Sequence, residues 1–240
     1  MLSILKKELN QFFSSLTGYI AIILFLFINA IFLFMLQDSS IFEFGYASLD
    51  KFFELAPWIL MFLVPAITMR TLSDEFRAGT FEILKTKPLS AWQIVVGKYF
   101  SILIILLLAI LPTLVYVVTI KALSAQGGID SGGILGSYIG LFLLSAVFAA
   151  IGLCCSGFTN NAVVAFLISA FGCLVLYFGF NALSKLPFFA NGLDYYVEML
   201  GIDFHYRSMS RGVLDSRDLV YFLSIIFIFL LATVKNLHKK

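Results

Sequence analysis

The sequence predicts an all-α protein that crosses a membrane several times and forms one transmembrane domain over residues 1–240. Hydrophobic residues make up 61% of the chain and charged residues only 12%, against roughly 25% charged residues in a soluble domain. The apolar residues fall into runs close to the ~20 residues that a transmembrane helix needs. A net charge of +2 is too small to suggest a nucleic-acid partner.

Residues 1–17 predict an amphipathic helix that lies in the cytoplasmic membrane interface. Ile4, Leu9 and Phe12 fall near one helical face, while Lys6 and Lys7 fall elsewhere, as in helices that lie flat at a membrane surface. The alternative is a polar lead-in that only anchors the topology of the first span.

Six apolar runs have the length and composition of membrane-spanning helices. The second run is the shortest and contains Pro57 and Pro65, which we expect to kink the helix or to end its regular part. The predicted spans are 19–36, 55–69, 94–120, 134–156, 162–183 and 219–234.

The charges of the loops predict the orientation, because Lys and Arg accumulate on the cytoplasmic side of a membrane. With both termini inside, the inside loops carry ten basic and four acidic residues, and the outside loops carry six basic and ten acidic residues. We therefore expect a multi-pass protein of a bacterial cytoplasmic (inner) membrane with both termini in the cytoplasm. Segment 70–90 then lies in the cytoplasm, and 184–218 forms an extracytoplasmic loop.

A polar stretch, ITMRTLSDEFRAGTFEILKTKPLS (67–90), separates the second and third apolar runs. Its pattern predicts a short amphipathic helix on the cytoplasmic surface, with Asp74–Arg77 and Glu82–Lys85 as i,i+3 ion pairs. Gly79 costs about 1 kcal/mol in a helix centre, which suggests close approach of another backbone or a break. The alternative is a solvated loop helix whose charges only set topology.

Catalytic and nucleotide-binding patterns are missing from the sequence. We interpret the three cysteines, which lie inside apolar runs, as packing residues, and neither histidine has a ligand-spaced partner. The Gly97-Lys98 pair is followed by Tyr99, where a P-loop needs Ser or Thr. We expect no catalytic, metal or cofactor site on this chain, so any ATP and Mg²⁺ would be bound by a partner.

Two stretches carry a resemblance to a known family. VPAITMRTLSDEFRAGTFEILKTKPLSAWQIVVGKYFS (64–101) combines a proline-bearing span, an acidic residue before Gly-Thr-x-Glu, a Thr-x-Pro exit and a following Gly-Lys. AAIGLCCSGFTNNAVVAFLIS (149–169) is a small-residue helix end, a polar turn and a restart. Over nearly the whole chain the sequence resembles the permease subunits of ABC-2 type exporters, also called the type V exporter fold. The matching positions are Glu75, Gly79, Thr80, Glu82, Leu84, Thr86, Pro88, Gly97 and Lys98.

The resemblance implies that a separate cytoplasmic P-loop ATPase drives the protein, and that a second permease copy or a paralogous subunit completes it. It also implies that the segment between spans two and three relays the ATPase's closure to the membrane. Glu75 and Glu82 would then hold salt bridges that keep the relay rigid, and Gly79 and Thr80 would allow close packing. The residues assigned to this coupling are Arg70, Asp74, Glu75, Arg77, Gly79, Thr80, Glu82, Thr86 and Pro88.

Within the family, the short loops and compact size are most similar to gliding-motility permease subunits (GldF type), with copper-site maturation permeases as the nearest competitor. Two other functions stay open. One is a scaffold that anchors a motility or secretion machine without transporting. The other is a polytopic lipid-modifying enzyme, for which His205, Asp203, Glu198 and Ser208 lie near one another in sequence without forming a recognisable constellation.

Overall fold

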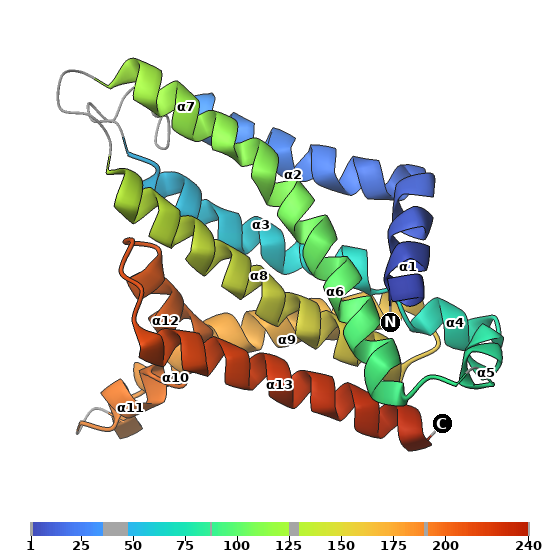
Figure 1. Ribbon diagram of the computed structural model, residues 1–240. Helices are drawn as coiled ribbons and strands as arrows, with labels where there is room; N and C mark the ends of the chain where they lie inside the picture. Colours follow the sequence, from blue (N-terminus) through green and yellow to red (C-terminus); the bar gives the residue numbers. More distant parts are fainter. Residues whose placement is uncertain (1, 36–47, 87, 125–129, 190–191, 240) are drawn as a thin grey trace.

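The computed structural model describes residues 2–35, 48–86, 88–124, 130–189 and 192–239, and every regular element in these ranges is helical (Figure 1). The prediction of an all-α fold is confirmed. The elements are α1 (Leu2–Ser14), α2 (Leu16–Phe34), α3 (Asp50–Thr68), α4 (Ser73–Arg77), α5 (Thr80–Lys85), α6 (Ala91–Ile110), η1 (Leu111–Thr113), α7 (Leu114–Leu123), α8 (Ser131–Phe158), α9 (Ala162–Leu174), η2 (Val175–Gly179), α10 (Phe180–Ser184), η3 (Pro187–Phe189), α11 (Asp194–Glu198), α12 (Ile202–Met209) and α13 (Ser216–Lys239).

Five helical stretches within the described residues are long and apolar enough to cross a membrane, and there are six if α1 and α2 count together as one bent span. The two halves of that pair meet at 70°. With 19 residues, α2 alone rises about 28 Å, close to the ~30 Å of a hydrocarbon core. The predicted end of the first span, residue 36, lies outside the described residues, and the interfacial position of 1–17 stays a prediction.

The second span is longer than predicted, because α3 already begins at Asp50 and continues through both prolines. Pro57 has no N–H, so the carbonyl of Phe53 loses its helical donor. Tyr206 of α12 replaces that donor, with its hydroxyl 2.7 Å from the Phe53 oxygen. The freed carbonyl is therefore satisfied inside the bundle, and neither proline ends the helix.

The centre of the bundle is α8, which packs against α3, α6, α9, α12 and α13 (Figure 1). Small residues along α8 allow these close contacts. A Cβ built on Gly140 would lie 2.6 Å from Cβ of Met209, and one built on Gly152 would overlap the Thr68 hydroxyl. The predicted packing role of these two glycines is confirmed, and the predicted polar turn falls between the end of α8 and the start of α9.

The third and fifth spans each form one continuous helical stretch, as predicted, and each contains a turn of another helix type. The 3₁₀ turn η1, with Pro112 near its start, separates α6 from α7. The π-helical turn η2 separates α9 from α10 and buries Tyr177. Phe178, in the same turn, contacts Trp58 of α3 with ring centroids 4.3 Å apart. The π turn thus presents Phe178 to α3, while Tyr177 contacts Phe148 of α8 and Tyr206 of α12.

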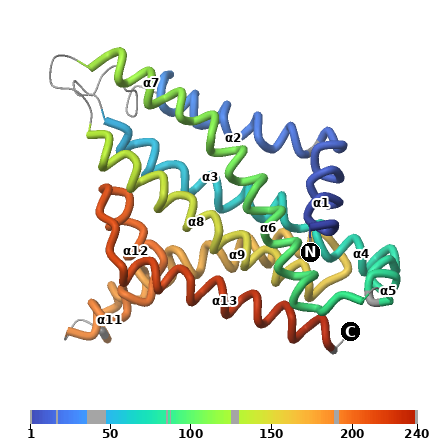
Figure 2. The backbone as a smooth tube through the Cα atoms, viewed as in Figure 1, coloured from blue at the N-terminus to red at the C-terminus, as the bar shows by residue number. Residues whose placement is uncertain are grey.

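The two ends of the bundle differ. The start of α1, the end of α13 and the pair α4–α5 lie at one end, while α11 and α12 lie at the other, as the chain trace in Figure 2 shows. The predicted loop 184–218 contains η3 and these two short helices. Both ends of the chain therefore approach the polar segment, in agreement with an even number of spans.

Candidate functional site

The candidate site begins where α3 ends, at a turn that a serine of α8 holds in place. The Ser156 hydroxyl accepts hydrogen bonds from the backbone N–H groups of Leu72 and Ser73, at 3.0 and 3.1 Å. It donates one to the Met69 carbonyl at 3.0 Å. These backbone groups lie at the end of α3 and the start of α4, where a helix cannot supply their hydrogen-bond partners itself. One buried side chain therefore fixes the position of the polar segment on the centre of the bundle.

The polar segment is two short helices, not the single helix that the sequence predicts. The break falls at Gly79, whose φ of 69° lies in the left-handed region, which glycine adopts without the steric cost of a side chain. A Cβ built there would meet nothing within 4 Å, so a break explains this glycine and close backbone approach does not. Phe76 and Phe81 bridge the break with an edge-to-face contact, 4.9 Å between centroids.

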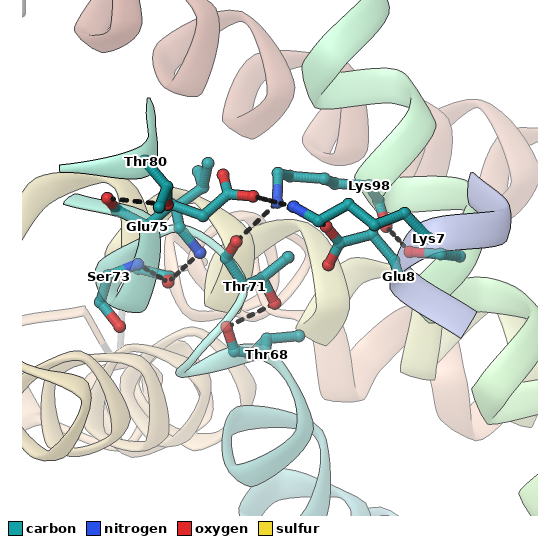
Figure 3. A network of polar contacts seen from close by, with 11 residues as sticks. Lys7, Glu8, Thr68, Thr71, Ser73, Glu75, Thr80 and Lys98 are labelled. Carbon is teal, nitrogen blue, oxygen red and sulfur yellow. Dashed lines mark hydrogen bonds and ion pairs between the residues drawn. The ribbon is translucent and has the colours of Figure 1, made fainter. Parts of the chain in front are cut away.

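A buried ion network joins the polar segment to α1 and α6 (Figure 3). Nζ of Lys98 lies 2.8 Å from Oε1 of Glu8 and 3.0 Å from Oε1 of Glu75. It also donates to the Thr71 carbonyl at 2.8 Å. Lys7 adds a second contact to Glu75 at 2.7 Å. Ion pairs thereby join residues that are far apart in the chain, such as Glu8 and Lys98, which are 90 positions apart.

The network is balanced in charge, although the second carboxylate oxygen of Glu75, Oε2, is buried without a hydrogen-bond partner among the described residues. An ammonium group has three donors, and Lys98 places one on each of its three acceptors. Its side chain is only 1% exposed, and those of Glu8 and Glu75 are 11% and 12% exposed. Two lysines and two glutamates sum to zero charge, as burial of ionised groups demands. Lys98 is the eighth residue of α6, so this lysine lies about 10 Å along the helix from its first residue.

The other predicted coupling residues form the exposed side of the segment. Thr80 donates a hydrogen bond to the Glu75 carbonyl at 3.4 Å. Among the side chains that the structure describes, Glu82 has no ion-pair partner, and Asp74 and Arg77 do not pair with each other. The predicted salt bridge is therefore present at Glu75, whereas the side chain of Lys85, the predicted partner of Glu82, lies outside the described part of the chain. Exposed side chains at predicted coupling positions are those of Arg70, Arg77, Thr80, Glu82, Thr86 and Pro88.

Two clefts flank the polar segment. One, of about 480 Å³, lies between α1 and α4–α5 and is lined by Arg70, Asp74 and Glu75 among others. The other, of about 660 Å³, lies between α5 and the α8–α9 turn and includes Glu82 and Asn160. The exposed ridge between them is α5, which contributes Ile83 to the first cleft and Glu82 to the second, and Ile83 is 63% exposed. The ridge and the two clefts lie side by side at the end of the bundle where α1 starts and α13 ends.

Sequence reasoning missed Lys7, Glu8 and Ser156 as site residues, and it used Lys98 only as a topology marker and family match. A signal was available for Lys98, because its position in an apolar helix made a buried charge necessary. The partners of Lys98 come from distant segments and carry no local pattern.

The enzyme alternative has no assembled site among the described residues. His205 contacts Asp218 at 2.7 Å and the Met199 carbonyl at 2.9 Å. Asp203 and Glu198 instead contact Arg207. In the part of the chain that the structure describes, no group of three or more metal-ligating side chains lies together.

Comparison with known proteins decides the family. The model of the ABC-2 family transporter proteins matches residues 2–195, most of the chain. The chain belongs to the ABC-2 family. Together with the membrane-spanning helices, this membership makes it a multi-pass membrane protein of the permease type. The ABC-2 match includes α4–α5 and all four members of the ion network, whereas α12 and α13 lie beyond it. No individually curated protein is similar enough to match the chain.

Proposed function

We propose that this ABC-2 permease couples ATP hydrolysis by a separate cytoplasmic P-loop ATPase to movement of its membrane helices, and that α4–α5 is the relay. The partner holds the ATP and Mg²⁺, and this chain supplies no catalytic residue. The proposal extends to a bacterial inner membrane, to cytoplasmic termini, and to a second copy or a paralogous permease as membrane partner.

The observation that carries the proposal is the combination of an exposed ridge and a buried anchor in one segment. Glu82 and Ile83 face outward, where a partner can reach them. Glu75, on the same segment, is tied to Lys98 of α6 and to α1. Force applied to the ridge is therefore transmitted to three elements at once, and a rigid element of this kind can bias two arrangements of packed helices.

The same relay serves export of a substrate or mechanical work in gliding motility or secretion. The GldF-type assignment belongs to this proposal and rests on size and loop length. A non-transporting scaffold would need no rigid link between its cytoplasmic ridge and its spans, so the buried network favours a moving part.

Co-purification in mild detergent tests the proposal. We expect the native chain to bring down a P-loop ATPase, identified by mass spectrometry and by ATP hydrolysis. An Ile83→Asp, Glu82→Ala variant loses that partner, while Val213→Asp, a matched change at an exposed apolar residue of the opposite end, keeps it. A chain that binds no ATPase, or a ridge variant that retains full binding and hydrolysis, contradicts the relay.

A further inference from the structure

A further cleft, outside the relay, lies at the opposite end of the bundle. It has a volume of about 830 Å³ and lies between the start of α3 and α12, within the range of small-molecule sites. The π turn η2 contributes Tyr177 and Phe178 to it, and π turns inside helices frequently occur at functional sites.

The α3 wall of this cleft is acidic, and the α12 wall carries two arginines together with one carboxylate, Asp203. Asp50 and Glu54 project from α3 at i and i+4, and Arg207 and Arg211 project from α12 and its following turn with the same spacing. Among the described residues, no ion pair crosses the cleft. The carboxylates of α3 and the arginines on the α12 side therefore face each other across the cleft without forming an ion pair.

On each side of the cleft, one of the two charged residues forms an ion pair with a residue close to it. Glu54 pairs with Lys51 at 3.0 Å. Arg207 pairs with Asp203 and Glu198, and its hydrogen bond to Asp203 raises the pKa of the guanidinium. One carboxylate, Asp50, and one guanidinium, Arg211, have no ion-pair partner among the described residues. The cleft is thus prepared for one cation and one anion.

The walls are held at a fixed separation. The Tyr206 hydroxyl, at the cleft floor, connects α12 to the freed carbonyl of α3 at 2.7 Å. Ser137 of α8 donates to the Ser210 carbonyl at 2.8 Å, and Met209 lies against Gly140. Because α3 also packs on α8, the cleft is preorganised, and a ligand does not need to order it.

An apolar track leads from the cleft along the sides of α3 and α9. Trp58 and Phe62 are 48% and 53% exposed on α3, and Val175 and Phe171 are 40% and 68% exposed on the α9 side. These residues lie in spans, where exposed apolar surface faces hydrocarbon chains, and tryptophan is typical of the membrane interface. A ligand with a charged end and an apolar end therefore fits the charged cleft and the apolar track beside it.

We propose that the cleft binds a zwitterionic phospholipid of the phosphatidylethanolamine class. Its ammonium lies against Asp50, its phosphate accepts from Arg211, and its acyl chains follow the track past Trp58. Phosphatidylglycerol supplies the phosphate and lacks the cation, and soluble phosphoethanolamine supplies both charges and lacks the chains.

Tryptophan fluorescence tests this directly, because the chain contains only two tryptophans. In a Trp92→Phe background Trp58 is the only one left. We expect brominated phosphatidylethanolamine in vesicles to quench Trp58 more than brominated phosphatidylglycerol at equal mole fraction. Soluble phosphoethanolamine does not relieve that quenching at matched concentration.

Variants identify the cleft as the origin of the difference. Asp50→Asn and Arg211→Gln each lower the apparent affinity for phosphatidylethanolamine about tenfold, the effect of one lost charged hydrogen bond. Arg217→Gln, which removes an exposed cation outside the cleft, leaves it unchanged. Equal quenching by the two lipids, relief by the soluble headgroup, selectivity that survives both cleft variants, or a second copy crosslinked at position 58 in place of lipid would overturn the proposal.

Discussion

Removal of the Lys98 ammonium should destabilise the protein far more than removal of the Lys7 ammonium. Lys98→Met leaves two carboxylates, Glu8 and Glu75, that are 11% and 12% exposed and face each other with only Lys7 nearby. Breaking a buried ion pair by deleting one partner costs about 3–5 kcal/mol. Lys7 is 52% exposed, and exposed ion pairs contribute about 0–1 kcal/mol.

The measurement is unfolding in mixed micelles, followed by circular dichroism as the fraction of denaturing detergent rises. We expect Lys98→Met to lower the free energy of unfolding by about 3–5 kcal/mol and Lys7→Met by about 1 kcal/mol or less. Adding Glu8→Gln and Glu75→Gln to Lys98→Met should recover most of the loss, because no unpaired charge remains buried. Equal, small losses for the two lysine variants would refute the network as the anchor of the segment.

Three further predictions concern the surroundings of the relay. Gly152→Ala forces a Cβ into the Thr68 hydroxyl and should cost about 1–3 kcal/mol of unfolding free energy, whereas Gly172→Ala, whose Cβ would stand 3.5 Å from its nearest neighbour, should be nearly neutral in the same assay. Ser156→Ala leaves the turn after α3 without its partner and should cost about 1–3 kcal/mol, with hydrogen exchange rising at residues 72–73 before other sites. Gly79→Ala requires a left-handed alanine and should cost about 1–2 kcal/mol, measured by unfolding with Ala78→Gly as control.

The spans were predictable from the sequence because they are long apolar runs, and the position of α4–α5 was predictable because its polarity interrupts two of them. Helix ends and breaks that depend on tertiary contacts were not predictable from the sequence. The continuation of α3 through Pro57 depends on Tyr206, which lies 153 residues away. The break at Gly79 was one of two meanings that the sequence allowed for that glycine.

The ion network was likewise not predictable, because it depends on tertiary contacts. The resemblance implied salt bridges at Glu75 and Glu82 alike, yet the partners of Glu75, Lys7 and Lys98, come from α1 and α6, and no local spacing connects them. Glu82 carries the same charge in a similar local setting and remains exposed. Only the packing of α1 against α6 distinguishes the anchoring glutamate from the outward one.

Site-specific photocrosslinking from the relay ridge tests the central claim most directly. A photoreactive benzoylphenylalanine replaces Ile83, and the same residue replaces Val213 as control, in cells that produce the full chain. The relay predicts an adduct between position 83 and an ATP-binding chain, with a yield that changes when ATP hydrolysis is blocked, and no such adduct from position 213. Crosslinks from position 83 only to lipid or to unrelated proteins would contradict it.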